Sequence, residues 1–307
     1  MKAATIQNYG DAIEFTDIAK PTLTDDSVII EVHAASLNPI DNILRMGYLK
    51  EMLPLTFPHV MGYDVSGVVV EVGEQVKKVK VGDAVYARPN QEDAGAMAEF
   101  ARLKESELAI LPDNLSHTQA AAVPLAGLTA WQALITHGKL KKGDKVLIHA
   151  GSGGVGTYAI QIAKHFGAFV ATTTSSKNTE LVKSLGADVA IDYKTQKFQD
   201  ELSDYDLVFD MLGGETMTES FKVLKRDGTM VSIKGQDIDD LATKYGVRFE
   251  FIFMTPDGAM LAELGDLISN GSVKPIIDSE FPLNEITAAY DQLDTGRTVG
   301  KIVVAVK

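Results

Sequence analysis

The sequence predicts an α/β protein of two domains, one made of short antiparallel strands and one built on a doubly wound parallel sheet. Two observations predict this fold class. Turn-bounded runs of β-type residues fill the chain to about residue 113, and apolar strand-like runs alternate with helical stretches after residue 116. The length of 307 residues exceeds that of a usual single domain, which also favours two domains.

The first domain is predicted from short strands that turn residues separate. The clearest are Val28–Val32, with its alternating polar position, the valine-rich run Val65–Val72, and Ala84–Ala87, which follows a Gly-Asp turn. Residues 99–101 and 108–112 are further strand candidates. Together these runs predict a coiled β-barrel or a sandwich.

The second domain is predicted from alternating helical and strand-like stretches. The pattern becomes helical at residues 116–119, which carry a capping pattern, and 129–136 continue it. The strand-like runs that follow are 145–149, 169–173, 188–191, 207–210, 229–233 and 248–253. Helical stretches at 156–166, 179–185 and 215–224 separate the earlier runs. This alternation is typical of parallel βαβ units.

The end of the chain returns to the pattern of the first domain. Residues 260–269 and 286–293 have helical patterns, and 302–306 is a strand candidate like those of the first domain. We therefore predict one discontinuous domain formed by residues 1–119 and 270–307. Residues 120–269 are predicted to form the second domain, inserted between its two parts.

Composition excludes several classes of function. The chain has no cysteine, so disulfides, thiolate nucleophiles and thiolate metal sites are excluded. The net charge of −13 disfavours binding to nucleic acid or an anionic membrane surface, and no run approaches the ~20 apolar residues of a membrane helix. The first residues lack the pattern of a secretory signal, so we expect a cytoplasmic location.

A glycine-rich run follows strand-like residues 145–149 and opens the next helical stretch. In this context a GxGxxG pattern predicts a Rossmann dinucleotide site, because Gly151 permits a tight turn, Gly153 lets a pyrophosphate approach the backbone, and Gly156 permits close packing. The helix N-terminus supplies N–H donors for the phosphates. The alternative is a glycine-rich turn without a ligand. The residues predicted to hold the cofactor here are Gly151, Ser152, Gly153, Gly154, Val155 and Gly156.

The segment after the second strand of this domain favours NADPH over NADH. An NAD-specific enzyme presents Asp or Glu about 20 residues after the glycines, where this chain has Ser175, Ser176 and Lys177. Hydroxyl groups and an ammonium suit a 2′-phosphate, which a carboxylate would repel. The alternative is that these residues form only a polar helix cap.

Three segments together resemble the medium-chain dehydrogenase/reductase superfamily over essentially the whole chain. They are the glycine-rich run with its helix, residues 36–41 (Ser-Leu-Asn-Pro-Ile-Asp), and residues 58–67, which begin Pro-His-Val-Met-Gly-Tyr-Asp. The resemblance is to the zinc-free NADPH:quinone oxidoreductase branch. It implies a GroES-like β-barrel catalytic domain, a Rossmann cofactor domain, and a homodimer that pairs edge strands, for which residues 248–254 are the candidate.

Departures from the zinc-binding members of this superfamily predict that no metal is bound. Those members carry a Cys ligand near Ser36 and a His-Glu pair where this chain has Tyr63-Asp64. His59 with Asp41 and Asp64 is one conceivable ligand set, and a packed loop histidine is the other interpretation. Without a Lewis acid, catalysis must hold the nicotinamide against an acceptor that is already electron-poor, such as a quinone or a conjugated enone.

The resemblance also assigns individual residues. Asn38 is expected to orient the substrate oxygen, or else to be a turn residue, and Tyr48 to line the nicotinamide pocket, or else to be a half-buried loop residue. Thr129 matches a threonine of the family that lies near the carboxamide group of the nicotinamide, or else it is a threonine inside a helix that bonds back to a carbonyl. Tyr193 matches a tyrosine near the 2′-phosphate, or caps a strand. Arg297 is expected to add positive charge near the phosphates, or to be a surface turn residue.

The loops after the later strands are further cofactor candidates. Ligands of such sheets bind outside the carboxyl ends of the strands, which predicts contacts from Leu212, Gly213, Lys234 and Gly235. Three functions stay open from the sequence: an NADPH-dependent quinone reductase, a reductase of enals or enones, and a sensor or structural protein that binds NADPH with little turnover. The small-molecule acceptor itself is not readable from the sequence.

Overall fold

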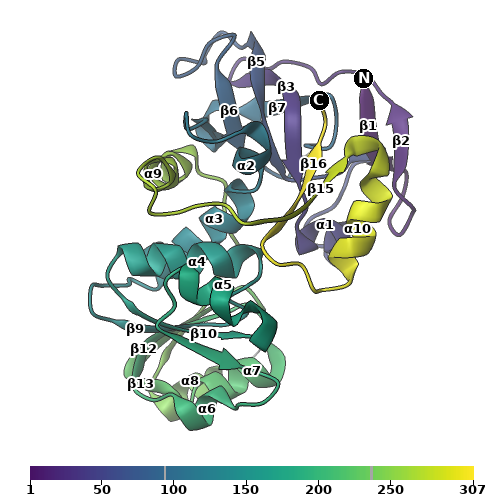
Figure 1. Ribbon diagram of the computed structural model, residues 1–307. Coiled ribbons are helices and arrows are strands. Elements are labelled where there is room, and N and C mark those ends of the chain that lie inside the picture. Colours follow the sequence, from purple (N-terminus) through teal and green to yellow (C-terminus); the bar gives the residue numbers. More distant parts are fainter. Residues whose placement is uncertain (93–94, 236–237) are drawn as a thin grey trace. The chain divides into compact units, whose positions relative to one another are not determined.

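A computed structural model describes residues 1–92, 95–235 and 238–307 (Figure 1). By their internal contacts these residues form two units. Unit 1 consists of Met1–Leu128, Thr255–Gly271 and Pro275–Lys307, and unit 2 consists of Thr129–Met254 and Ser272–Lys274. None of the described helices combines the length and the apolar character that crossing a membrane requires.

The boundaries between the units differ from those predicted from the sequence, which were 119/120 and 269/270. Two helices account for the difference. Helix α2 (His117–Ala121) packs against strands of unit 1, as does α9 (Gly258–Ser269). The hydroxyl of Tyr86 donates to the carbonyl of Leu261 at 2.8 Å, which ties α9 to the unit 1 sheet. Both helices therefore belong to unit 1, although the last two residues of α2 and all of α9 lie inside the range 120–269 expected for the cofactor domain.

The described residues of unit 1 form two sheets. One has the order β2-β1-β4, and the larger one has the order β15-β16-β3-β5-β6-β8 with β7 paired to β3. The strands are β1 (Lys2–Ile6), β2 (Glu14–Asp17), β3 (Ser27–Ser36), β4 (His59–Val60), β5 (Asp64–Val72), β6 (Ala84–Ala87), β7 (Phe100–Lys104), β8 (Leu108–Ile110), β15 (Ile277–Pro282) and β16 (Lys301–Ala305). The helices besides α2 and α9 are α1 (Pro39–Arg45), α3 (Pro124–Trp131), which continues into unit 2, and α10 (Ile286–Asp294).

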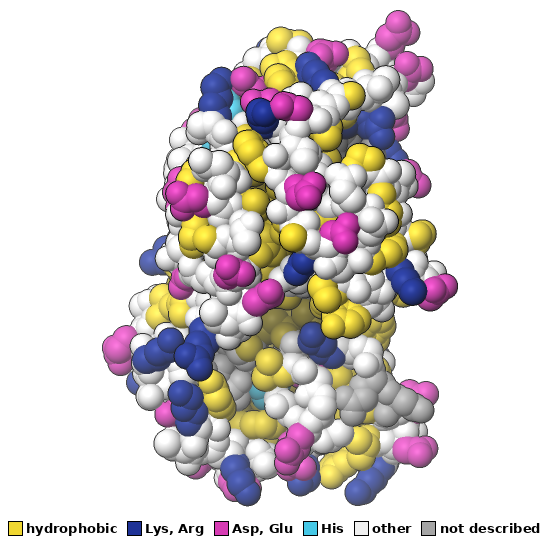
Figure 2. Space-filling model, turned by 90° about the vertical axis from the view of Figure 1, so that its right-hand side faces the viewer, with side chains coloured by type: hydrophobic (Ala, Val, Ile, Leu, Met, Phe, Trp, Pro, Cys, Tyr) yellow, Lys and Arg dark blue, Asp and Glu magenta, His cyan; other side chains and the backbone are white. Residues whose placement is uncertain are grey.

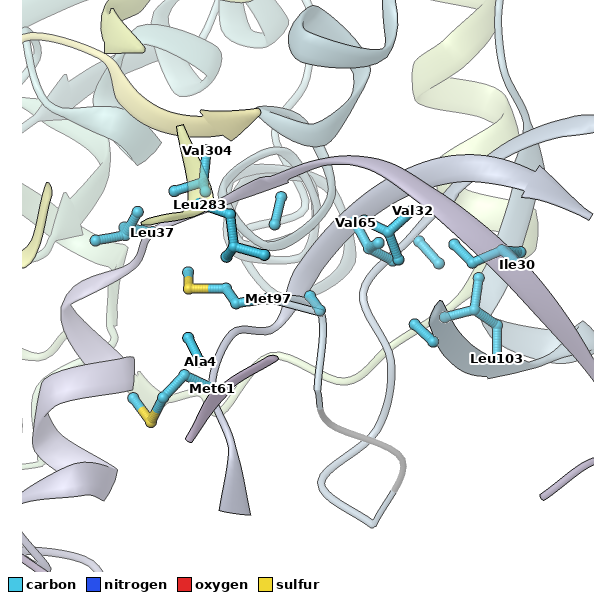
Figure 3. Close-up of a cluster of buried hydrophobic side chains, with 14 of the residues drawn as sticks. Ala4, Ile30, Val32, Leu37, Met61, Val65, Met97, Leu103, Leu283 and Val304 are labelled. Carbon is cyan, nitrogen blue, oxygen red and sulfur yellow. The ribbon is translucent and has the colours of Figure 1, made fainter. Parts of the chain in front are cut away.

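The core of unit 1 brings together segments that are distant in sequence (Figure 3). Met61, Met97 and Leu283 pack together, and Leu37 and Val304 belong to the same buried cluster. Burial of such side chains is the main term that stabilises this arrangement. Because Leu37 is anchored in this core, the next residue and the start of α1 have a fixed position.

In the described part of unit 2, six parallel strands form a sheet in the order β11-β10-β9-β12-β13-β14. Along the chain this is the order 3-2-1-4-5-6 of a Rossmann fold, so the predicted fold class is confirmed. Helices α4 and α5 cover one face, and α6, α7 and α8 cover the other (Figure 1). The strands are β9 (Lys145–Ile148), β10 (Phe169–Thr174), β11 (Val189–Asp192), β12 (Tyr205–Asp210), β13 (Leu224–Ser232) and β14 (Arg248–Phe251). The helices are α4 (Gly154–His165), α5 (Thr179–Ser184), α6 (Phe198–Glu201), α7 (Gly214–Ser220) and α8 (Asp239–Tyr245).

Some elements differ from the sequence prediction. The helix expected over 215–224 ends at Ser220, and β13 already begins at Leu224. The helix expected from Thr129 starts at Pro124 instead, since proline fits the first turn of a helix, and a π-helical turn over Gln132–His137 follows it. The strands β1, β2 and β15 and the helices α1 and α8 were not predicted, because each is short and carries no strong period.

Acidic and basic side chains are interspersed over the face of the molecule that Figure 2 shows, with hydrophobic side chains between them. The net charge of the chain is −13, which does not favour a polyanionic partner.

Candidate functional site

The glycine-rich turn of unit 2 connects β9 to helix α4. Gly153 is the N-cap of α4, with φ −80° and ψ 175°, and no side chain caps the helix. The N–H groups in the first turn of this 12-residue helix are therefore left for a ligand, and the helix dipole adds a positive potential at the same place. This is the arrangement that a pyrophosphate requires.

Two of the glycines in the turn are required by close packing. A Cβ atom on Gly151 would lie 2.0 Å from Oγ1 of Thr172, and one on Gly156 would lie 2.3 Å from the carbonyl oxygen of Ala150. A Cβ atom on Gly153 would meet only that carbonyl, at 3.3 Å, so the space above Gly153 is otherwise open. The turn therefore fits a dinucleotide, whose phosphates need access to the backbone there.

A series of buried hydrogen bonds connects the turn to helix α7. Ala150, whose φ is 51°, donates its N–H to Oγ1 of Thr173 at 3.1 Å, and Oγ1 lies 3.1 Å from Nδ1 of His149. Nε2 of His149 lies 2.8 Å from Oγ of Ser220, which donates to the carbonyl of Thr216 at 2.7 Å. Burial lowers the pKa of His149 to about 4, so the ring is neutral. Because Ser220 uses its hydrogen on Thr216, it accepts from Nε2, which therefore carries the hydrogen of the ring.

The residues expected to hold the 2′-phosphate follow β10. Ser175 is buried, while Ser176 and Lys177 are exposed. Next to them, Nδ2 of Asn178 donates to Oγ of Ser152 in the glycine-rich turn at 3.0 Å. The structure thus brings this segment against the turn that would bind the pyrophosphate, through a residue, Asn178, that the sequence analysis did not select.

Tyr193 lies at the same edge of the sheet, directly after β11. Its N–H donates to the carbonyl of Thr174, the last residue of β10, at 3.2 Å. Its side chain is 59% exposed, so the ring is available to a ligand near Ser175 to Lys177.

The loops after β12 and β13 are held by a buried carboxylate. The predicted residues on them are Leu212, Gly213, Lys234 and Gly235. Asp210 is fully buried and accepts the N–H groups of Leu212 at 3.1 Å and Gly213 at 3.1 Å. Ser232 donates to Asp210 at 2.7 Å and accepts the N–H of Lys234 at 2.9 Å. Asp210 and Ser232 therefore couple the two loops at the carboxyl ends of their strands.

The other predicted residues are divided between the units. Thr129 is the first residue of unit 2 and lies inside α3 with 4% of its surface exposed. Asn38, Tyr48 and Arg297 belong to unit 1. Asn38 is 3% exposed and caps α1, whereas Tyr48 is 75% exposed in the turn after that helix. Arg297 is exposed in the turn between α10 and β16.

Asn38 is part of a buried polar cluster in unit 1 that centres on Asp64. Oδ2 of Asp64 accepts hydrogen bonds from Oγ of Ser36 at 2.9 Å and from Nδ2 of Asn38 at 2.8 Å. Oδ1 accepts the N–H of Leu125 at 2.7 Å. The ammonium of Lys301 lies 3.1 Å from Oδ2 and completes a salt bridge whose two side chains are 0% and 3% exposed. This carboxylate is saturated with donors.

A second buried group surrounds Tyr63, beside the first. Its hydroxyl donates to Oε1 of Gln91 at 2.9 Å, and the guanidinium of Arg88 lies 5.0 Å from the ring centre. Asp41 accepts the N–H of Asn38 at 2.8 Å through Oδ2. Burial raises the pKa of Asp41 to about 7. Within the described residues, Oδ1 of Asp41, Nε of Arg88 and Nε2 of Gln91 lack a hydrogen-bond partner.

Comparison with known proteins identifies the family. Residues 24–113 match the model of the alcohol dehydrogenase GroES-like domain, and residues 185–304 match that of the zinc-binding dehydrogenases. The chain is 41% identical to the 2-methylene-furan-3-one reductase of Solanum lycopersicum and 40% identical to the chloroplastic NADPH-dependent alkenal/one oxidoreductase of Arabidopsis thaliana. Each alignment covers 99% of this chain and 79% of the relative. The chain belongs to the medium-chain dehydrogenase/reductase superfamily.

A solved structure agrees with this membership over the full chain. The quinone oxidoreductase from Coxiella burnetii superposes with a TM-score of 0.93 at 36% identity, covering 100% of this chain and 99% of that one. The resemblance drawn from the sequence is therefore confirmed. So is the predicted reaction class of this superfamily member, oxidation and reduction that depends on NAD(P)H.

The residues at the zinc position of the superfamily form hydrogen bonds with other side chains. Ser36 donates to Asp64, and the hydroxyl of Tyr63 donates to Gln91. His59 is buried, and burial lowers its pKa to about 4, in agreement with a packed histidine. Among the described residues, no group of three His, Asp or Glu side chains has a geometry that could hold a metal ion.

The residues that the sequence analysis missed are polar, and all but the half-buried Asn178 are buried. Each has a hydrogen-bond partner more than 20 residues away in the sequence, so no local pattern marks them: Asn178 with Ser152, Asp210 with Ser232, His149 with Ser220 and Lys301 with Asp64. Asp210 had one available signal, since it is the last residue of a predicted parallel strand, where ligand-binding loops begin.

Proposed function

We propose that this protein is an NADPH-dependent reductase that transfers hydride to a quinone without a bound metal ion. The cofactor supplies the hydride from its nicotinamide. Unit 2 supplies the uncapped N-terminus of α4 for the pyrophosphate, and Ser175, Ser176 and Lys177 for the 2′-phosphate. The single observation that carries the choice of NADPH is this segment after β10, where hydroxyls and an ammonium stand in place of a carboxylate.

The choice of acceptor rests on the chemistry of unit 1. Ser36, Tyr63 and Asp64 occupy the zinc position of the superfamily, and each of their side chains is hydrogen-bonded to another side chain. An acceptor reduced beside such residues must itself delocalise the charge that arrives with the hydride. Quinones do so, because hydride added to a ring carbon moves the conjugated C=C and C=O electron pairs onto a carbonyl oxygen, which then takes up a proton. Tautomerisation of this product gives the hydroquinone.

Reduction of an enal or enone is the second candidate, and the relatives favour it. The two plant relatives are named as reductases of a furanone and of alkenals or alkenones. In this reaction the hydride adds to the β-carbon and the proton to the α-carbon, so the same cofactor geometry serves both candidates.

Stopped-flow loss of NADPH absorbance with a panel of quinones and enones tests the proposal. Rapid quinone-dependent loss supports the first candidate, and loss with enones alone supports the second. Tight NADPH binding without any turnover would instead support a sensor or structural protein. The measurement is repeated after treatment with a chelator, and a loss of turnover that a divalent ion restores would contradict the metal-free reaction.

We further propose that the protein is a homodimer formed through β14. This strand is at the edge of the unit 2 sheet, and Phe251 and Phe253 are 49% and 44% exposed there. Light scattering after size exclusion is expected to give about twice the chain mass of 33.1 kDa, and about that mass for Phe253→Lys. A monomeric wild type contradicts the proposal.

The expected cytoplasmic location stays a prediction, which cell fractionation tests.

A further inference from the structure

Lys301 is a buried lysine whose ammonium is held by three oxygen atoms. Nζ donates to the carbonyl of Leu37 at 2.8 Å, to Oδ1 of Asn38 at 2.5 Å and to Oδ2 of Asp64 at 3.1 Å. An ammonium has three hydrogens and no acceptor, so these partners replace its hydration completely. A buried charge requires such compensation, which makes the position of this group well defined.

These contacts also determine which way the amide of Asn38 faces. Oδ1 accepts from the ammonium, and Nδ2 donates to the carboxylate of Asp64 at 2.8 Å. Turning the amide by 180° would place its NH2 group against the ammonium and its oxygen against the carboxylate. Both contacts would then be repulsive, so the charges of Lys301 and Asp64 permit a single orientation.

One hydrogen of this amide is left over. Nδ2 of Asn38 carries two hydrogens, and Asp64 accepts one of them. Throughout residues 1–92, 95–235 and 238–307, no other hydrogen bond from Nδ2 is formed. The ammonium on Oδ1 draws electron density from the amide, which makes the remaining N–H a stronger donor.

We propose that Lys301 is a positioning residue that fixes and polarises the amide of Asn38, so that its free N–H donates to the carbonyl oxygen of the acceptor. This inference rests on the proposed function and names the group that recognises the substrate. When hydride adds to the acceptor, negative charge develops on that oxygen, and a donor already held in place stabilises it without reorganisation. Asn38 is then the residue that touches the substrate, and Lys301 acts through it.

Kinetics of Lys301→Met with a quinone or enone acceptor test the proposal. We expect kcat/KM for the acceptor to fall about 10-fold or more, while the dissociation constant for NADPH stays unchanged, because the glycine-rich turn and the segment after β10 proposed to bind its phosphates lie in unit 2. Lys307→Met is the matched control, since it removes an exposed lysine that is paired with Glu31. In an Asn38→Ala background, Lys301→Met should cause little further loss, because the donor that it positions is already absent.

A second variant separates this effect from loss of the fold. Lys301→Met leaves the carboxylate of Asp64 buried without its cation, whereas Lys301→Met/Asp64→Asn removes both charges. We expect the double variant to unfold cooperatively, to bind NADPH as the wild type does, and to show the same fall in kcat/KM. Unchanged kcat/KM in both variants, a full further loss in the Asn38→Ala background, or parallel weakening of NADPH binding would each overturn the proposal.

A measurement without turnover distinguishes failure of this inference from failure of the proposed function. In 15N-resolved spectra, the side-chain amide hydrogens of Asn38 should exchange with solvent more slowly in the wild type than in Lys301→Met, which keeps Asp64 as the acceptor of one of them. If the wild type reduces no acceptor but this difference is present, the proposed function fails and Lys301 still fixes the amide. If the exchange rates are equal, Lys301 does not position Asn38.

Discussion

Asn178, which follows strand β10, donates a hydrogen bond of 3.0 Å to the hydroxyl oxygen of Ser152 in the glycine-rich turn. This bond joins the segment expected to bind the 2′-phosphate to the turn expected to bind the pyrophosphate. The pyrophosphate and the 2′-phosphate of the cofactor would therefore be bound by side chains that are connected to one another. A substitution in the segment after β10 is expected to change the affinity for NADPH more than the affinity for NADH.

The exposed side chain of Lys177 supplies the first prediction. Lys177→Glu should weaken binding of NADPH by about 10-fold or more and leave binding of NADH nearly unchanged, because a carboxylate repels the 2′-phosphate that only NADPH carries. Titration of the cofactor fluorescence measures both dissociation constants. Lys183→Glu, at another exposed position, is the control for net charge. Equal weakening of the two cofactors would show that another group holds the phosphate.

Substitutions at two glycines of the turn should have different effects, one on the stability of the fold and the other on the binding of NADPH. Gly156→Ala places a Cβ atom 2.3 Å from a backbone carbonyl, and such overpacking should lower the free energy of unfolding by about 1–3 kcal/mol. Gly153→Ala meets that carbonyl only at 3.3 Å, so it should fold normally and bind NADPH more weakly. Denaturant unfolding and cofactor titration distinguish the two variants. Normal NADPH affinity in Gly153→Ala would show that the pyrophosphate binds elsewhere.

His149 predicts a dependence of stability on pH. Burial lowers its pKa from 6.5 to about 4, so the unfolded chain binds more protons between these values and stability falls on acidification. Between pH 7 and pH 5 this group should account for about 2 kcal/mol of lost unfolding free energy. His149→Asn should show a correspondingly shallower decline in denaturant unfolding at the two pH values. The same decline in variant and wild type would mean that the ring is not held neutral by its burial.

Tyr48 tests the residue assigned by family resemblance. Its side chain is 75% exposed, so Tyr48→Phe should leave the melting temperature within about 1 °C of the wild type. If the hydroxyl donates to the substrate, kcat/KM should fall about 10-fold while NADPH binding is unchanged. Steady-state kinetics against Tyr9→Phe provide the comparison, since the Tyr9 hydroxyl instead accepts the N–H of Leu55 at 2.7 Å. Wild-type kinetics in Tyr48→Phe would restrict Tyr48 to a loop role.

The elements that the sequence predicted are those with a local signature. The alternation of apolar strands and helices over 145–253 predicted the parallel sheet, and GxGxxG at a strand-to-helix junction predicted the turn before α4. Short elements such as α1 and β15 carry no such period, since they are positioned by their neighbours instead. For the same reason α9 was assigned to the cofactor domain instead of unit 1. Its sequence predicts a helix, whereas its packing on β8 decides the unit to which it belongs.

By itself the sequence determined the two-domain α/β class, the dinucleotide turn, the absence of a carboxylate after the second strand, and the absence of cysteine. Only the tertiary structure decided the partners of the buried polar groups. Lys301 and Asp64 are 237 residues apart, and His149 and Ser220 are 71 apart, yet each pair is in hydrogen-bond contact. Periodicity records which face of an element is buried, whereas the partner of a buried charge depends on which strands become neighbours when the sheet forms.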